Sequence, residues 1–429
     1  MPLTIAEKIL AAHAGQKELR PGQIIIVEPD VLLANDITAP LALKIFSELG
    51  GKKILHPERV VLVLDHFTPN RDLAAAEACA EIRRFAHQHL LPNFFEGGEA
   101  GIEHALLPEQ GLVLSGQLII GADSHTCTYG ALGAFATGMG STDFAVALLT
   151  GRVWLKVPES IQVIFSGPLP PWVGGKDLIL HLISRLGVEG ANYRVLEFSL
   201  AEGLSLGMSD RFTISNMATE AGAKAGIFAP DQATEEFLRG KTEKTYTIYS
   251  SDRNALYRET LKIDVTALTP QVALPSSPAN AVPVEAAPEV KLDQVVIGSC
   301  TNGRIEDLRI AARILAGHRA APGLRLIILP ATPTIYQQAL REGLIETFLS
   351  ARAVIAPPSC GPCLGGHLGV IAAGEQALAT TNRNFPGRMG HPDSRVYLSG
   401  PAVAAASAIT GRITHPREIV STPPAPEAK

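Results

Sequence analysis

Short apolar segments alternate with helical segments along most of this chain, and this pattern constrains the fold more than any other feature. Candidate strands are Ile24–Val27, Val60–Leu64 and Leu118–Ile120, whereas Leu73–His89 has helical character. Parallel strands need crossover connections, usually helical, so the alternation is typical of a parallel α/β architecture. A chain of 429 residues is too long for one ordinary core, and we expect two or three such domains.

A cluster of prolines indicates one boundary between domains. They recur at 270, 275, 278, 283 and 288 within the stretch from Thr269 to Pro288, which excludes a regular helix or a central strand there. The last nine residues, 421–429, lack any apolar period, so we expect a flexible tail.

Composition narrows the class of protein. No uninterrupted apolar run approaches the length that crosses a bilayer. The start of the chain has the helix-capping pattern Thr4-x-x-Glu7, with an acid where a secretory signal would be basic. We therefore expect a cytoplasmic protein. A formal net charge of -5 and 5% aromatic residues give little support to nucleic-acid binding.

Three of the five cysteines follow predicted strands. Gln294–Ile297 is a strand that leads through a turn, 298–303, to a helix over Arg304–Leu315, and Cys300 lies in that turn. The next strand and helix are Leu324–Leu329 and Thr332–Glu342, with Gly343 as a C-cap. A further strand at 353–356 leads to Cys360 and Cys363. Because ligands bind outside the carboxyl ends of parallel strands, we expect these three thiols to converge.

Three converging thiolates suit a cubane iron-sulfur cluster with one open iron, since an electron carrier usually supplies four cysteines. Other interpretations remain open at this point. A C-x-x-C pair is otherwise typical of zinc or redox sites, and Cys300 by itself fits a buried core thiol. We expect Cys79 to pack in a core, while Cys127 lies within a polar motif.

Four segments together resemble the aconitase superfamily, in particular the branch of the 3-isopropylmalate dehydratase large subunits and the homoaconitases. They are Gly-Ala-Asp-Ser-His-Thr at 121–126, Ile-Gly-Ser-Cys-Thr-Asn-Gly-Arg at 297–304, Ser-Cys-Gly-Pro-Cys-Leu-Gly at 359–365 and Thr-Asn-Arg-Asn-Phe-Pro-Gly-Arg at 381–388. They occur in the family's order, and the resemblance spans nearly the whole chain. It implies a fold of three α/β/α domains around a central cluster crevice, at about 1–158, 159–278 and 279–420.

The resemblance also implies a 4Fe-4S cluster, one per subunit, held by Cys300, Cys360 and Cys363 with one iron open to substrate. The chemistry would be a hydro-lyase reaction on a small hydroxy acid, which needs a proton for the leaving hydroxyl and cations for the carboxylates. The implied catalytic residues are Asp65, His66, His104, Asp123, His125 and Glu220. The implied substrate-binding residues are Ser124, Asn382, Arg383 and Arg388.

Each of these residues also has a plain structural interpretation. A single His66 or His104 is commonly a satisfied structural histidine, Glu220 suits a surface cap, and Arg383 and Arg388 would normally be surface charges. Ser124 and Asn382 suit ordinary turns. The sequence differs from aconitases at two positions. Pro40 and Thr128 stand where aconitases have a glutamine and an asparagine that contact citrate, and these differences favour the dehydratase-like branch.

A complete aconitase has a further, swivelling domain that carries the catalytic base, and this sequence stops before it. We therefore expect a separate small subunit and a heterodimer or a dimer of heterodimers. The leading substrate is isopropylmalate, in leucine biosynthesis, with homocitrate or homoaconitate and methylmalate or citraconate as alternatives. Two other classes of function remain open. One is an iron-sensing RNA-binding protein, which the acidic net charge disfavours, and the other is a C-x-x-C thiol oxidoreductase.

Overall fold

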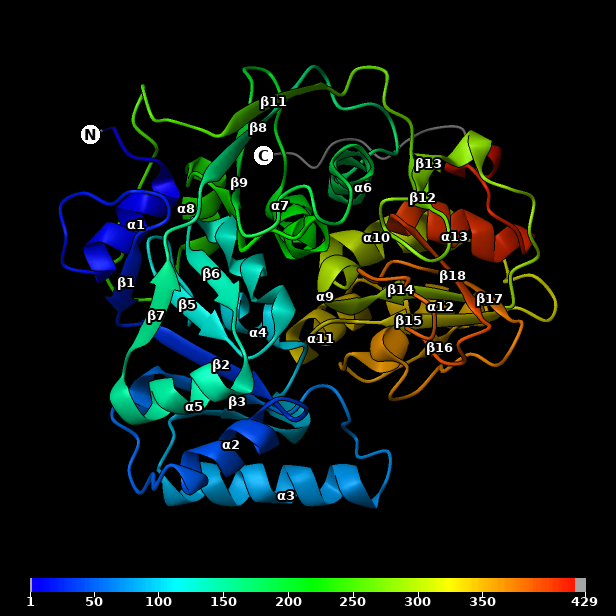
Figure 1. Ribbon diagram of the computed structural model, residues 1–429. Helices are drawn as coiled ribbons and strands as arrows, with labels where there is room; N and C mark the ends of the chain where they lie inside the picture. Colours follow the sequence, from blue (N-terminus) through cyan, green and yellow to red (C-terminus); the bar gives the residue numbers. More distant parts are fainter. Residues whose placement is uncertain (1, 421–429) are drawn as a thin grey trace. The chain divides into compact units, whose positions relative to one another are not determined.

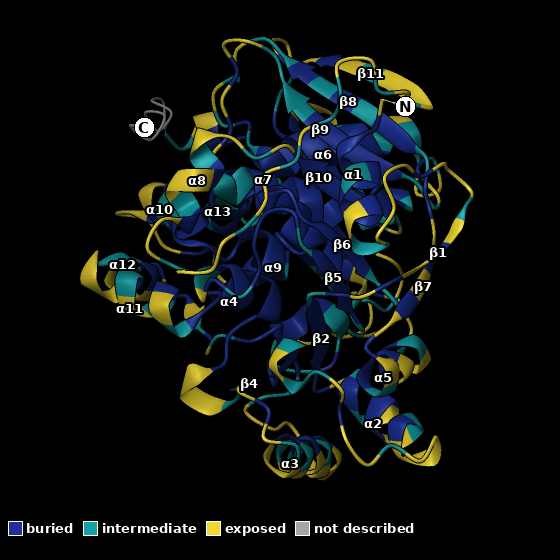
Figure 2. Ribbon diagram, turned by 90° about the vertical axis from the view of Figure 1, so that its left-hand side faces the viewer, coloured by how far each residue is buried: buried dark blue, intermediate teal, exposed yellow. Residues whose placement is uncertain are grey.

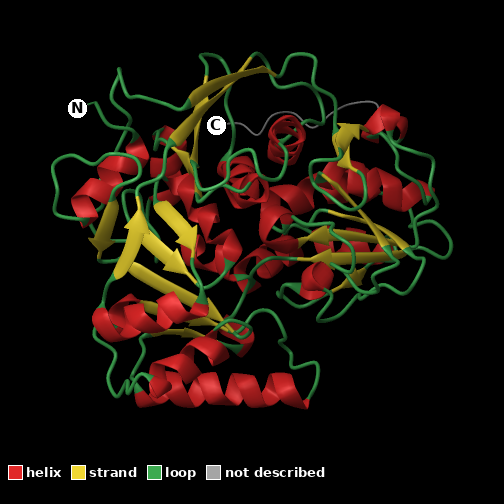
Figure 3. Cartoon of the chain, in the orientation of Figure 1, coloured by secondary structure: helices red, strands yellow, loops and turns green. Residues whose placement is uncertain are grey.

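The computed structural model describes residues 2–420. The predicted tail, 421–429, lies outside the described residues. Contacts divide the chain into two compact units. The first contains the residues up to Phe165 together with Ala191–Ala201 and Ser215–Ile263, and the second contains Ser166–Gly190, Glu202–Ile214 and the residues from Asp264 on. Figure 3 shows helices beside strands in both units, so the expected mixed α/β architecture with parallel sheets is confirmed.

The centre of the first unit is a five-stranded sheet in the order β4-β3-β2-β5-β6, with every neighbouring pair parallel. Its strands are β2 (Val31–Asn35), β3 (Val60–Val63), β4 (Asn93–Phe95), β5 (Leu118–Gly121) and β6 (Phe135–Gly138). Strands β2, β3 and β5 are buried along their whole length, as Figure 2 shows for β2 and β5. Continuous apolar runs of this kind are what a sheet covered on both faces requires.

The first unit has two smaller sheets. One has the order β10-β9-β8-β11 and comprises β8 (Ser160–Ser166), β9 (Val195–Leu200), β10 (Ala225–Phe228) and β11 (Glu259–Asp264). The other joins β1 (Ile24–Val27) antiparallel to β7 (Val153–Lys156). The predicted strand Ile24–Val27 therefore exists but lies outside the parallel sheets, and Ile24 and Ile26 are exposed while Ile25 and Val27 are buried.

Helices cover these sheets, and α2, α3 and α5 lie on one side of the five-stranded sheet (Figure 1). The α-helices of this unit are α1 (Ile5–His13), α2 (Ala39–Glu48), α3 (Leu73–Gln88), α4 (Glu103–Glu109), α5 (Ser141–Thr150) and α8 (Gln232–Leu238). The 3-10 helices are η1 (Pro57–Arg59), η2 (Gly97–Glu99), η3 (Ser124–Leu132) and η4 (Ala218–Ala221). Helix α7 (Met208–Met217) contains residues of both units. The capping pattern predicted at Thr4 and Glu7 is confirmed as a capping box that begins α1.

The second unit is built on a seven-stranded sheet in the order β13-β12-β18-β17-β14-β15-β16. Its strands are β12 (Gln271–Ala273), β13 (Ala281–Pro283), β14 (Gln294–Gly298), β15 (Arg325–Leu329), β16 (Val354–Ile355), β17 (Gln376–Ala379) and β18 (Arg395–Ser399). The last five are parallel, and β12 is antiparallel to both its neighbours. The helices are α6 (Gly175–Leu186), α9 (Ser299–Asn302), α10 (Ile305–Leu315), α11 (Pro333–Arg341), α12 (Leu344–Ser350), α13 (Pro401–Thr410), η5 (Val284–Ala286), η6 (Gly361–Leu364) and η7 (Pro416–Glu418).

The exclusion of a central strand from the proline-rich stretch is wrong. Strand β12 lies between β13 and β18 and pairs with both. The reason is spacing: residues 271–274 contain no proline between Pro270 and Pro275, so their N–H groups remain available for pairing. Pro283 lies in β13, at the edge of the sheet, where a missing donor is tolerated.

The strand, turn and helix pattern predicted around the cysteines is confirmed in outline, with one difference. The segment expected as a turn at 298–303 contains the short helix α9. Among residues 2–420 the structure has no helix long and apolar enough to span a membrane.

Gly298, at the carboxyl end of β14, is expected to be intolerant of a side chain. Its φ of 142° lies in a region that favours glycine, and a Cβ would overlap the carbonyl oxygen of Leu329. We expect Gly298→Ala to lower the free energy of unfolding by at least about 2 kcal/mol. Denaturant unfolding measures this. Gly207→Ala is the control, because a Cβ there meets open space, and it should change stability by less than about 0.5 kcal/mol. Equal effects of the two substitutions would contradict the steric explanation.

Candidate active site

In the first unit, polar side chains gather where the parallel strands end. Asp36 follows β2, Asp65 and His66 lie just beyond β3, and Asp123 and His125 lie just beyond β5. Strands β3, β2 and β5 are consecutive neighbours in the sheet. Their carboxyl ends therefore share one edge, which is where ligands bind in sheets of this type.

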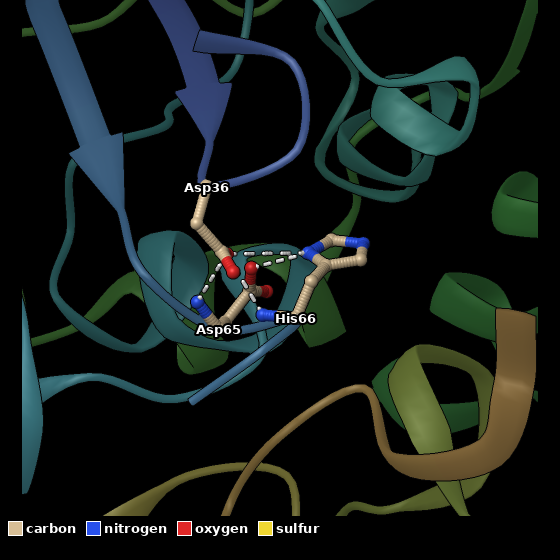
Figure 4. Close-up of side chains that lie close together, drawn as sticks. All are labelled: Asp36, Asp65 and His66. Carbon is tan, nitrogen blue, oxygen red and sulfur yellow. Dashed lines mark hydrogen bonds and ion pairs between the residues drawn. The ribbon is translucent and has the colours of Figure 1, made fainter. Parts of the chain in front are cut away.

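His66 is held by the carboxylate before it. Nδ1 of His66 lies 2.6 Å from Oδ1 of Asp65, which is fully buried, and Oδ2 of Asp65 accepts the backbone N–H of Glu103 at 2.8 Å. Figure 4 shows the pair. Burial by itself lowers the pKa of His66, but the charge and hydrogen bond of Asp65, together with the charge of Asp36, outweigh it and raise the pKa well above its usual range. The imidazole is thus protonated, and Nε2 is its second proton-bearing atom.

Asp36 anchors this pair. Its Oδ1 accepts the backbone N–H groups of Asp65 and His66, both at 2.9 Å, and its Oδ2 accepts that of Phe67 at 2.7 Å. Asp36, Asp65 and His66 offer ligand atoms within 4.8 Å of one another. Because both carboxylates already accept hydrogen bonds from the protein, we interpret this group as a support for His66 and not as a metal site.

Asp123 connects two further histidines. Its Oδ1 lies 2.9 Å from Nε2 of His104 and accepts the backbone N–H of His125 at 2.7 Å. Nδ1 of His104 lies 3.2 Å from the hydroxyl of Tyr129. Burial opposes ionisation of Asp123, but hydrogen bonds from His104 and His125 outweigh it and hold the pKa of Asp123 well below its usual range. Burial lowers the pKa of His104 in spite of Asp123, so that imidazole is neutral.

His125 also reaches a residue far along the chain. Its Nε2 lies 2.7 Å from Oε1 of Glu220 in η4, and both side chains are buried. Glu220 is therefore not the surface residue of the alternative interpretation. Ser124, beside His125, is exposed, with its hydroxyl 3.4 Å from Nδ1 of His125.

Glu103 is a member of this group that the sequence interpretation did not assign. It is 1% exposed, Oε1 accepts from Asn35 at 2.8 Å, and Oε2 is buried without a hydrogen bond. A carboxylate oxygen of Glu103 lies within 4.8 Å of ligand atoms of His66 and Asp123. Burial, and then the charges of Asp65 and Asp123, raise its pKa well above the usual range. These effects favour the neutral form of the Glu103 carboxyl beside Asp123.

A neutral Glu103 leads to a pH-dependent prediction for Glu103→Gln. In the unfolded chain a glutamate has a pKa of about 4.3, so it loses its proton at lower pH than the buried Glu103 of the folded chain. Rising pH therefore favours the unfolded chain and lowers the stability of the parent. Glutamine has no such loss. The stability of the variant relative to the parent should therefore increase as pH rises from about 5 toward the raised pKa of Glu103, by up to about 1.4 kcal/mol per pH unit.

Unfolding measured at several pH values tests this. Glu77→Gln, on an exposed position of α3, is the matched control and should follow the parent. A constant difference between parent and Glu103→Gln across this range would mean that Glu103 is ionised in the folded protein.

In the second unit, the three predicted cysteines also follow strand ends. Cys300 lies in α9, directly after β14, and Cys360 and Cys363 lie at η6, after β16. Each is at most 8% exposed, and none of the three forms a disulfide. Asn382 lies after β17, the other neighbour of β14. From β14 the chain passes first to β15, on one side, and later to β17, on the other side, so the strand order reverses at β14. Ligands bind at the carboxyl end of such a reversal point in parallel sheets.

Polar and cationic groups approach the sulfurs. Nδ2 of Asn382 donates to Sγ of Cys300 at 3.3 Å, and Sγ of Cys363 lies 3.5 Å from Oδ1 of Asn382. Nη2 of Arg388 lies 3.7 Å from Sγ of Cys363. Arg383, in the same loop, is half-buried. The structure thus brings Asn382 and Arg388 to the cysteines; their predicted role in binding substrate stays a prediction. In the first unit, Cys79 is buried in α3, and Cys127 contacts the carbonyl oxygen of Asn216 at 3.2 Å.

The surroundings of the three thiols fit an iron-sulfur cluster. Buried thiols with amide and guanidinium donors at 3.3–3.7 Å suit thiolate ligands of a larger, negatively charged cluster.

Comparison with known proteins shows the family of this chain. The model of the aconitase family (aconitate hydratase) matches residues 7–411. The chain belongs to the aconitase family. Membership implies an iron-sulfur cluster, and the family resemblance found in the sequence is confirmed.

Several relatives align over almost their whole length. The chain is 58% identical to 3-isopropylmalate dehydratase large subunit 1 of Pyrococcus furiosus, over 97% of this chain and 99% of that protein. It is 59% identical to the 3-isopropylmalate dehydratase large subunit of Moorella thermoacetica, over 98% and 100%. Among solved structures, Thermococcus kodakaraensis aconitase X in its holo-form matches with a TM-score of 0.50 and 14% identity over 89% of both chains. That likeness concerns the fold alone.

Proposed function

We propose that this chain is the large subunit of a hydro-lyase that interconverts 2-isopropylmalate and 3-isopropylmalate by dehydration and rehydration, in leucine biosynthesis. The observation that carries the proposal is the near-full-length identity of 58% to a 3-isopropylmalate dehydratase large subunit. The histidine and carboxylate groups of the first unit and the three cysteines of the second supply the chemistry such a reaction needs.

Cys300, Cys360 and Cys363 would hold a 4Fe-4S cluster, one per subunit. When bound, a cluster with three cysteine ligands supplies an open iron that acts as a Lewis acid toward the substrate. Arg388 and Arg383, in the loop after β17, would pair with substrate carboxylates, since a guanidinium offers two parallel donors. Asn382 and Ser124 would add hydrogen bonds to the substrate.

His66 would act as the general acid. Asp65 fixes Nδ1, so Nε2 can donate the proton that leaves with the substrate hydroxyl as water. Dehydration also breaks a C–H bond on the neighbouring carbon, and that proton goes to a base. Rehydration reverses both transfers on the opposite carbons. The raised pKa of His66 suits the role of an acid that holds its proton at neutral pH.

Asp123, His104, His125 and Glu220 would orient the hydroxyl or water. Asp123 holds both histidines, and Glu220 fixes Nε2 of His125. Such fixed hydrogen-bond directions lower the cost of reorganising polar groups during the reaction.

A separate small subunit would complete the enzyme, as the names of the relatives suggest. We assign the base for the C–H proton to that subunit, in a heterodimer or a dimer of heterodimers. The three α/β/α domains of aconitase type, at 1–158, 159–278 and 279–420, with the third holding the cluster, and the cytoplasmic location also remain proposals.

Anaerobic turnover tests this function. The chain, reconstituted with iron and sulfide, is mixed with a candidate small subunit and assayed against isopropylmalate, homocitrate, citrate and methylmalate. We expect turnover of isopropylmalate only with both subunits. Preference for homocitrate or methylmalate would instead assign a homoaconitase or a methylmalate hydro-lyase. Full activity of the chain alone would overturn the split site, and salt-sensitive RNA retention by the cluster-free chain without turnover would favour the iron sensor.

A further inference from the structure

Lys176, in α6 of the second unit, is a long cationic side chain that is only 1% exposed. A buried ammonium group is costly unless hydrogen bonds and negative charge compensate it. Nζ of Lys176 donates to the carbonyl oxygens of Thr380 at 2.8 Å and Thr381 at 2.7 Å. These carbonyl groups follow the last residue of β17 and immediately precede Asn382.

The segment that Lys176 holds is also tied to the strand that carries Cys300. The hydroxyl of Thr380 donates to the carbonyl oxygen of Gly298 and accepts its N–H, both at 2.9 Å. The hydroxyl of Thr301, next to Cys300, donates to the carbonyl oxygen of Thr380. One residue after this junction, Asn382 contacts the sulfurs of Cys300 and Cys363. Movement at Thr380 and Thr381 would therefore displace Asn382 from the thiols.

The charge of Lys176 also connects it to the cysteines. Burial lowers the pKa of Lys176 to about 7, and Cys300, Asp307, Cys363 and Asp177 act against that lowering. Two of these four opposing groups are cysteines of the proposed cluster site. Deprotonated thiolates at those positions therefore favour the ammonium form of Lys176.

We propose that Lys176 is a positioning residue for the cluster: it fixes the Thr380–Thr381 carbonyls so that Asn382 meets Cys300 and Cys363, and it places a buried positive charge beside these thiolates. The inference rests on the proposed function, since it concerns how the chain holds the cluster. Hydrogen bonds and net charge around the cysteines set both the retention and the reduction potential of such a cluster.

The test compares Lys176→Met, Lys176→Gln and Lys176→Arg with the parent after anaerobic reconstitution. Lys291→Met, at an exposed position of the same unit, is the control. Iron and sulfide content, the rate of iron release to a chelator and the midpoint potential from a dye-mediated titration are measured. None of these three readouts depends on turnover or on the small subunit.

We expect Lys176→Met to release iron about 10- to 100-fold faster than the parent and to have a lower midpoint potential, because removal of a positive charge disfavours the reduced cluster. Lys176→Gln keeps a donor but not the charge, so it should show the lowered potential even if Lys176→Met does not fold. Lys176→Arg and Lys291→Met should keep a potential near that of the parent.

A Lys176→Gln variant with parental iron retention and potential would overturn the inference while leaving the proposed function intact. An equal fall in potential for Lys176→Gln and Lys176→Arg would overturn the role of charge. A parent chain that takes up no 4Fe-4S cluster would overturn both the inference and the proposed function.

Discussion

Cys363→Ser is expected to abolish turnover and to leave the chain with little bound iron. Cys363 is 2% exposed, and its sulfur lies beside Asn382 and Arg388. A serine hydroxyl remains protonated at neutral pH and is a poor ligand for iron, so one of the three cysteine ligands is lost. Substitution of groups that merely support metal ligands costs about 10- to 100-fold, and we expect loss of a ligand to exceed about 100-fold. Iron and sulfide analysis and turnover with the small subunit measure this.

Cys79→Ser provides the matched control. Cys79 is buried in α3 of the first unit, where the amide of Asn70 donates to its sulfur at 3.1 Å. A hydroxyl can accept that hydrogen bond, so the variant should bind the parental amount of iron and retain activity. If Cys363→Ser kept a full, active cluster, the assignment of Cys363 as a ligand would be wrong.

The position of the cysteines could be predicted because it depends on local pattern. Cys300 lies between an apolar run and an amphipathic helix, and a second apolar run precedes Cys360 and Cys363. These patterns were enough to predict that the cysteines follow the carboxyl ends of parallel strands. The same local argument failed at β12. There the density of prolines outweighed the short proline-free segment that the sheet uses.

Pairings over long separations had no local signal. His125 and Glu220 are separated by 95 residues along the chain, and only the family resemblance indicated that both belong to one site. Asp36 was missed because its role depends on three backbone N–H groups, which no side-chain pattern reports. Glu103 was missed because its raised pKa follows from burial and from the charges of Asp65 and Asp123 in the folded chain.

His66→Gln is expected to lower kcat by about 100- to 10,000-fold, the usual contribution of a general acid, while the cluster remains bound. Glutamine can retain a hydrogen bond to Asp65, but it cannot supply a proton to the leaving hydroxyl. The cysteines belong to the other unit, so iron content should be that of the parent. His87→Gln, at an exposed position of α3, is the control and should leave kcat unchanged.

Asp65→Asn tests the electrostatic part of the same assignment through the pH profile of kcat. The acid form of His66 is present below its raised pKa and is lost as pH rises through it, so activity should fall at alkaline pH. Asp65 is the largest of the groups that raise this pKa, and without its charge the lowering effect of burial is opposed mainly by Asp36, so the pKa of His66 falls. The alkaline limb of the profile should therefore move to lower pH in Asp65→Asn, because the imidazole then loses its proton earlier. A limb that stays in place would mean that a group other than His66 donates the proton.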